Sequence, residues 1–188
     1  RCQDPLTEDI GVFARNVPLP VYLSTRDQKK QFIDENTFDL CGIYSVRGNV
    51  NCDYRLNVIQ NATIYLEDNC QLNVSKGIHV KKGCSLTIMG NGTVNINPPD
   101  RNEHYAGIGG NLRENGGDIT IAGGTIITTG DSCAPGIGAG YCANDWKLTV
   151  TGGTVIATGG MFATGIGRGT KDAGWPKGSL TLGPGMIM

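Results

Sequence analysis

The tripeptide Gly-Ile-Gly occurs three times in the second half of this chain, and its isoleucines are spaced 29 residues apart: Ile108, Ile137 and Ile166. The same offset relates the segment 119–121 (Ile-Thr-Ile) to 148–150 (Leu-Thr-Val), and the third copy of that segment arrives three residues late at 180–182. A fixed period of this length indicates stacked structural units, none of which buries its apolar side chains alone.

The residue types within each repeat predict strands. Every repeat holds three short apolar or β-branched runs separated by glycine pairs, Asn or Asp, and no run is long enough for a helix. Three strands joined by tight corners predict an all-β fold, a right-handed parallel β-helix whose layers lie about 4.8 Å apart. Two inward ladders are expected, listed here by residue: Ile108, Ile137 and Ile166 in one, and Ile121, Val150 and Leu182 in the other.

Two regions are predicted. Residues 1–55 are expected to form an N-terminal cap or lead-in containing one helix, from Ser24 or Thr25 to about Asn36. Residues 56–188 are expected to form the parallel β-helix, with three 29-residue-type repeats from about residue 105.

The first part of the expected β-helix has less regular repeats. Between residues 56 and 96 short segments alternate apolar and polar residues, and the 22-residue separation of Ile64 and Leu86 suggests a shorter layer. Alternation predicts that Asn, Thr and His79 point to solvent. The threonines that recur in the later repeats are likewise expected on a solvated face: Thr120, Thr125, Thr128, Thr129, Thr149, Thr151, Thr154 and Thr158.

Charge and hydropathy exclude several classes of partner. The formal net charge is −1 and no basic stripe is present, so nucleic-acid binding is not expected. No apolar run approaches the roughly 20 residues of a membrane-spanning helix. The last seven residues of the chain lie within a repeat and are largely apolar. We therefore expect either a piece of a longer protein or self-association through the C-terminal strand edge.

The cysteines are spread along the chain without any Cys-x-x-Cys pair. This spacing disfavours a zinc ribbon and suggests an oxidising compartment, outside the cell or on its surface. Pairing of sequence neighbours is the working hypothesis, with buried free thiols as the alternative. The expected bridges are Cys41–Cys52, Cys70–Cys84 and Cys133–Cys142, with Cys2 left over. Sequons at Asn61, Asn73 and Asn91 mark candidate glycosylation sites on the surface.

One pair of aromatic residues follows the repeat register. Trp146 and Trp175 each lie nine residues after the isoleucine of their repeat, so they are also 29 apart. Two indoles on neighbouring layers would form a step on which sugar rings stack, with Tyr141, Asp145 and Asp172 as polar neighbours. The alternative is that both indoles pack into a corner and seal the core.

No catalytic constellation emerges from the sequence. Polysaccharide lyases and hydrolases also use parallel β-helices, but they need converging carboxylates on one strand face. Here the strands carry Thr, Ile, Val, Leu and Gly, and the acids lie in turns at unmatched positions: Glu114, Asp118, Asp131, Asp145 and Asp172. No metal, cofactor or nucleotide site is predicted, because the Gly-x-Gly steps belong to the repeat itself.

The segments 106–110 (Ala-Gly-Ile-Gly-Gly), 123–130 (Gly-Gly-Thr-Ile-Ile-Thr-Thr-Gly) and 152–160 (Gly-Gly-Thr-Val-Ile-Ala-Thr-Gly-Gly) resemble the GIGGG-type glycine-rich β-helix repeats of secreted or cell-surface bacterial proteins. The resemblance covers roughly residues 56–188. It implies a non-enzymatic extracellular module, an adhesin stalk or a glycan-binding surface, whose partner is a glycan or another protein at the cell surface. The alternatives are a structural protein that assembles end to end and a polysaccharide-active enzyme.

Overall fold

The computed structural model describes residues 21–23, 32–34, 37–98, 103–170 and 177–184. This part of the chain is all-β and contains no helix. The strands, in chain order, are β1 (Val21–Leu23), β2 (Phe32–Asp34), β3 (Thr37–Val46), β4 (Asn49–Cys52), β5 (Arg55–Leu66), β6 (Gln71–Val74), β7 (Ile78–Val80), β8 (Ser85–Gly90), β9 (Thr93–Ile96), β10 (Ile108–Gly109), β11 (Asp118–Ile121), β12 (Thr125–Thr129), β13 (Ile137–Gly138), β14 (Lys147–Val150), β15 (Thr154–Thr158), β16 (Ile166–Gly167) and β17 (Ser179–Leu182).

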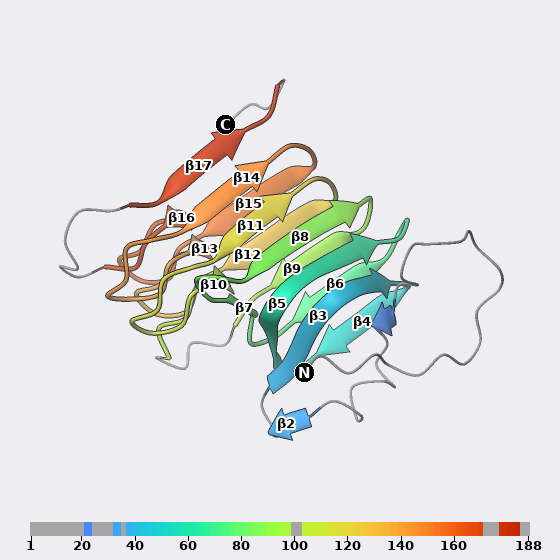
Figure 1. Ribbon diagram of the computed structural model, residues 1–188, viewed down its shortest axis with the longest axis horizontal. Coiled ribbons are helices and arrows are strands. Elements are labelled where there is room, and N and C mark those ends of the chain that lie inside the picture. The colour runs from blue at the N-terminus through green and yellow to red at the C-terminus, as the bar shows by residue number, and fades with distance from the viewer. Residues whose placement is uncertain (1–20, 24–31, 35–36, 99–102, 171–176, 185–188) are drawn as a thin grey trace.

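These strands form two sheets (Figure 1). The twelve-stranded sheet runs β16-β13-β10-β7-β5-β8-β11-β14-β17, with β3 paired to β5 and with β1 and β2 paired to β3, and the five-stranded sheet runs β15-β12-β9-β6-β4. Every pairing between strands is parallel except that of β2 with β3. The prediction of an all-β fold built from parallel strands is therefore confirmed.

The larger sheet is curled because β5 pairs with two different strands along its length. Its first half pairs with β7 and its second half with β8, so the sheet has two arms that meet along this strand. The chain then visits the arm of β7, the arm of β8 and the five-stranded sheet in turn. We call one such circuit a layer; β7, β8 and β9 form one layer, and β10, β11 and β12 form the next.

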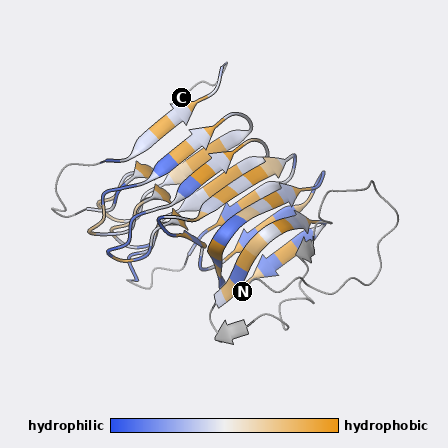
Figure 2. Cartoon of the chain, viewed as in Figure 1, coloured by the Kyte–Doolittle hydropathy of each residue, from blue (hydrophilic) through white to orange (hydrophobic). Residues whose placement is uncertain are grey.

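Layers are held in register by inward side chains. Ile78, Ile108, Ile137 and Ile166 are successive partners in one column. Ile121, Val150 and Leu182 are partners in another, and the late third segment pairs in full register with β14. The register of both predicted ladders is confirmed, although Leu182 in the last layer is 38% exposed. The column residues from Ile78 to Ile137 are fully buried, and orange and pale residues alternate along the strands in Figure 2.

Glycine is required on both sides of the repeated isoleucine. Gly109, Gly138 and Gly167 are register partners with φ of 138°, 142° and 144°, a region closed to other residues. A Cβ at Gly109 or Gly138 would also overlap the carbonyl oxygen of the glycine one layer on. The glycines before the isoleucine face similar crowding, since a Cβ at Gly107 would overlap Thr128 and Gly136. The Gly-Ile-Gly tripeptide is thus set by the close approach of successive layers.

The outward side of the five-stranded sheet carries no charged side chain along its strands. Inward residues such as Leu72, Val94 and Ile126 are buried, and the alternate residues face out. We call these outward residues the neutral face: Asn49, Asn51, Gln71, Asn73, Thr93, Asn95, Thr125, Ile127, Thr129, Thr154, Ile156 and Thr158.

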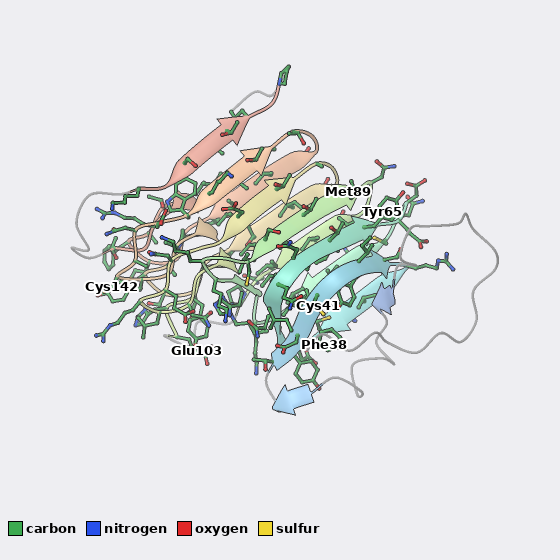
Figure 3. The ribbon with its side chains drawn as sticks, in the orientation of Figure 1. Phe38, Cys41, Tyr65, Met89, Glu103 and Cys142 are labelled. Atoms are coloured by element: carbon green, nitrogen blue, oxygen red, sulfur yellow. The ribbon has the colours of Figure 1, made fainter. Side chains whose placement is uncertain are left out.

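The arm of β8 offers a different outer surface. Asp118 and Lys147 are outward register partners there and form an ion pair of 3.4 Å. Tyr65 and Met89, also partners, lie exposed near the C-terminal ends of β5 and β8 (Figure 3). The two outer surfaces therefore differ in charge although both are built from the same repeat.

Some sequence predictions are wrong in the described residues. Phe32–Asp34 lies inside the predicted helix but forms β2, whose pairing with β3 outweighs local helix propensity; the rest of that helix lies outside the described residues. Ile64 pairs with Ile88, 24 residues further on, and not with Leu86; the 22-residue offset holds between Leu72 and Val94. Thr128 is buried, and its Oγ1 donates to the carbonyl of Gly136.

None of the three expected disulfides is present, because Cys52, Cys70, Cys84, Cys133 and Cys142 are not disulfide-bonded. Sequence neighbours are separated by the corners of the layer: Cys70 precedes β6 in one sheet and Cys84 precedes β8 in the other. A disulfide needs Cα atoms about 4.4–6.8 Å apart. Burial raises the pKa of the Cys52 thiol to about 12, so this cysteine is a small core residue. Cys2 lies outside the described residues.

Replacing Ile137 by Ala is expected to lower the free energy of unfolding by about 2–5 kcal/mol, because it opens a cavity between two layers. Ile156→Ala is the matched control: this isoleucine is 52% exposed on the neutral face, and its loss should change stability by no more than about 0.5 kcal/mol. Urea unfolding measures both. Equal effects of the two substitutions would contradict the ladder as the source of stability.

Candidate functional site

The predicted tryptophan step is only partly described. Trp146 is half-buried and packs against the core, and a Cβ at Gly178 in the next layer would overlap its indole. Trp175 and Asp172 lie outside the described residues. The surroundings of Trp146 favour the packing alternative for this indole.

The polar neighbours proposed for that step do not gather around Trp146. Tyr141 packs against the ring of His104, with centroids 4.9 Å apart. Asp145 pairs with Lys82 at 2.8 Å, and its backbone N–H donates to Asn115. Both side chains therefore hold neighbouring loops to one another.

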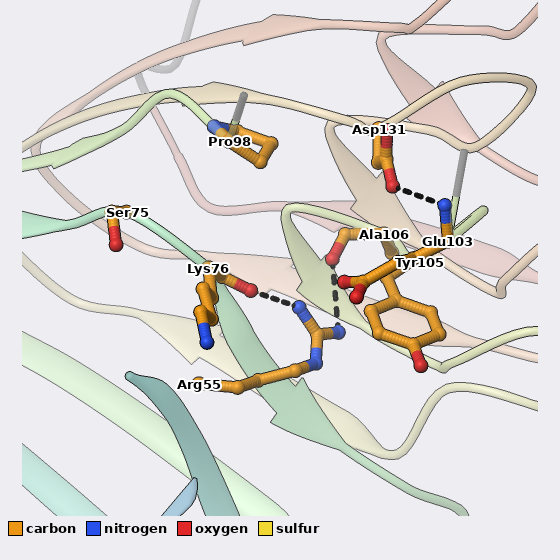
Figure 4. A pocket seen from close by; sticks show the side chains of 8 residues that line it. All are labelled: Arg55, Ser75, Lys76, Pro98, Glu103, Tyr105, Ala106 and Asp131. Atoms are coloured by element: carbon orange, nitrogen blue, oxygen red, sulfur yellow. Dashed lines mark hydrogen bonds between the residues drawn. The ribbon is translucent and has the colours of Figure 1, made fainter. Parts of the chain in front are cut away.

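The most unusual polar residue in the described chain is Arg55, which begins β5 and is only 5% exposed. Its Nε donates to Oδ1 of Asn111 at 2.8 Å, and its two Nη atoms donate to the carbonyls of Lys76 and Ala106. The guanidinium also lies over the Tyr105 ring, 4.7 Å from the centroid. Figure 4 shows the guanidinium between Lys76 and Ala106.

The Arg55 side chain extends across layers because the register-equivalent positions in the next two layers are glycines. A Cβ at Gly77 would overlap both Nη1 of Arg55 and the carbonyl of Gly107. Burial lowers the pKa of Arg55 to about 10, and Tyr105, Glu103, Asp131 and Glu114 oppose this decrease. Even so, the guanidinium is charged at neutral pH, which explains its three hydrogen bonds to the protein.

A small pocket opens beside this arginine; Ser75, Lys76, Pro98, Glu103, Tyr105, Ala106 and Asp131 complete its lining (Figure 4). Asp131 is the buried acid of the group. Its Oδ2 accepts from the backbone N–H groups of Glu103 and His104, and its Oδ1 accepts from that of Ser132. A carboxylate with three backbone donors orders the loop and is poorly placed to act on a substrate.

His79 contradicts its predicted exposure, because it is 8% exposed and has a carboxylate beside it. Asp39, Asn57 and His79 are register partners in three layers. Asn57 Nδ2 donates to Asp39 at 2.7 Å, so its Oδ1 accepts from Nδ1–H of His79 at 2.8 Å. Glu114 from a later layer brings Oε2 to 2.8 Å from Nε2, with poor alignment for a hydrogen bond.

Acidic side chains from separate turns nevertheless come near one buried cation. Glu103, Asp131 and Glu114 all come near Arg55, although they lie in turns at unmatched repeat positions. Layers of unequal length bring these turns together. The sequence contained one signal for the Arg55 site. An arginine stands immediately before an apolar strand, at a position where the later layers carry glycine.

The three sequons differ in their surroundings. Asn61 and Asn91 are exposed, and they bond to Ser85 and Asp68 respectively. Asn73 lies inside a row of amides, donating to Asn51 and accepting from Asn95. Attachment of a sugar to Asn73 would leave it one N–H donor in that row.

The described residues contain no cluster of three or more His, Cys, Asp or Glu suited to a metal ion. Nor do they include a helix able to span a membrane. Comparisons with family models, with curated proteins and with solved structures give no match to the chain.

Arg55→Met is expected to lower the free energy of unfolding by about 2–4 kcal/mol, because it leaves the Lys76 and Ala106 carbonyls without their donors. Arg47→Met is the control: its guanidinium bonds Glu67 from a side chain that is 68% exposed, and its loss should cost less than about 1 kcal/mol. Urea unfolding distinguishes the two. Similar small losses would show that Arg55 does not hold the layers together.

Acidification is expected to destabilise the fold through His79. Burial lowers its pKa below the ordinary 6.5, Arg55 adds to this effect, and Glu114 works against it. A histidine with a lower pKa in the folded state binds fewer protons than in the unfolded chain, so stability falls as the pH drops below about 6.5. His79→Gln should therefore lose less stability than wild type between about pH 7.5 and pH 5.5. Equal losses of unfolding free energy in wild type and His79→Gln between these two pH values would contradict this prediction.

Proposed function

We propose that the chain is a right-handed parallel β-helix of the glycine-rich repeat type found in secreted and cell-surface proteins. Its proposed role is non-enzymatic: a rigid stalk whose outer surface binds glycans outside the cell. The support for the solenoid is that each layer contributes one segment to each of three stacks. Parallel connections of this kind are right-handed by strong preference.

One observation carries the functional proposal: the side chains most capable of acid–base chemistry are already hydrogen-bonded to other groups of the protein. Arg55 bonds two carbonyls and an amide, Asp131 bonds three backbone N–H groups, and His79 continues a row of polar partners across layers. Groups held in this way support a scaffold better than a reaction. The long outer surfaces of the stack are then the parts available to a partner.

Two alternatives remain as proposals of lower support. A polysaccharide-active enzyme would use the acids near Arg55, of which Glu103 and Glu114 are exposed. End-to-end assembly would use β15, β16 and β17, where the inward residues Val155, Ile166 and Leu180 are only partly buried.

The test is a glycan array probed with the full chain, followed by incubation with each glycan that binds. We expect binding to at least one class of glycan and no release of reducing ends or unsaturated products. Product release would replace the proposal with the enzymatic alternative, and an array without hits would contradict glycan binding. Light scattering over a range of protein concentrations tests the assembly alternative on the same sample.

A further inference from the structure

The neutral face is the surface best suited to a ligand. The chain has 16 Lys and Arg and 17 Asp and Glu in 188 residues, which would place about two charges among twelve average positions. The neutral face has none, whereas the arm of β8 carries Asp118 and Lys147 at outward positions. Solvation alone does not favour such neutrality, since charged side chains are the usual occupants of exposed positions.

Polar and apolar groups are arranged in rows across this face. Asn73 donates to Asn51 at 2.8 Å, and Asn95 donates to Asn73 at 3.0 Å. In the next two layers the same row continues as Ile127 and Ile156, which are 39% and 52% exposed. The neighbouring row holds Thr93, Thr125 and Thr154. The strands are about 4.8 Å apart, so each row repeats a similar group at that interval.

Asn73 and Asn95 in the amide row retain bonding capacity. A carboxamide has two N–H donors, and each link of the row uses one of them. The threonine row adds hydroxyls that both donate and accept. Exposed Ile127 and Ile156 give flat apolar contact area beside these polar groups.

This chemistry matches a neutral polysaccharide. Hydroxyl and amide groups can bond sugar hydroxyls, while the isoleucines can cover the C–H faces of the rings. An acidic or sulfated glycan, or a nucleic acid, would lose hydration without meeting a cation on the face. A second copy of the chain is disfavoured by size, because the face spans roughly 24 Å by 16 Å, about half the 800 Å² per partner of a stable protein interface.

We infer that the neutral face binds a linear, uncharged polysaccharide. The polysaccharide lies over the outward residues of β9, β12 and β15. This inference rests on the proposed glycan-binding function and specifies both the surface and the class of glycan. It assigns no role to Trp146.

The experiment compares matched variants of the full chain in pull-down with insoluble cellulose, insoluble xylan and polygalacturonate. Thr125→Asp/Thr154→Asp places charge on the neutral face, and Thr120→Asp/Thr149→Asp places it at outward register partners on the arm of β8. We expect wild type to bind a neutral polysaccharide and not polygalacturonate. The face variant should weaken that binding at least tenfold and the control variant less than twofold. Ile156→Ser, a smaller change, should weaken it several-fold.

Each other outcome is decisive. Neutral-glycan binding that survives the face substitutions, with unchanged melting temperatures, overturns the inference but leaves the proposed function standing. Wild-type binding to polygalacturonate and to neither neutral polysaccharide also overturns the inference and leaves the proposed function standing. Concentration-dependent dimers that the face variant abolishes would identify a second copy as the occupant and overturn it. Absence of wild-type binding to these glycans and to the array would contradict both proposals together.

Discussion

The structure depends on how closely one layer can approach the next. Strand pairing between layers fixes a separation of about 4.8 Å, and every inward side chain must pack against its register partners at that distance. The Gly-Ile-Gly tripeptide meets this requirement at the tightest point. Its isoleucine fills the interior, and its second glycine adopts a φ near 140° that other residues avoid. Both the regular repeats and the crowded corners follow from this one spacing.

The same constraint explains why polar chemistry is concentrated in the early layers. Layers before residue 105 are shorter and less regular, and residues other than glycine occupy most of the positions beside the first column, with Gly77 as the exception. Arg55 and His79 lie at positions that are Gly107 and Gly109 in the first regular repeat. Their side chains are covered by the longer loops of later layers, which bring Asn111 and Glu114 over them. Buried charge therefore arises where a short layer meets a long one.

Sequence periodicity was enough to predict the parallel strands and both ladders, because Ile137 and Val150 recur at an offset that is visible without any structure. It failed for His79, since strand alternation cannot reveal that a loop 35 residues further on covers an outward side chain. The cysteine pairs failed for a related reason: proximity in sequence means little where a corner places Cys70 and Cys84 beside different sheets. The helix prediction used only local propensity and missed the antiparallel pairing of β2 with β3.

The neutrality of one outer surface is not required by the stacking itself. Strand spacing constrains inward residues and glycines, but it leaves outward positions free to vary, as the ion pair of Asp118 with Lys147 demonstrates. A row of amides that bond one another across three layers, continued by two exposed isoleucines, therefore needs a cause outside the core. Partial hydrogen bonding within the row rigidifies the amides, and rigid donors lose less conformational entropy when a ligand binds. A preorganised and uncharged surface of this kind is suited to binding an uncharged polymer.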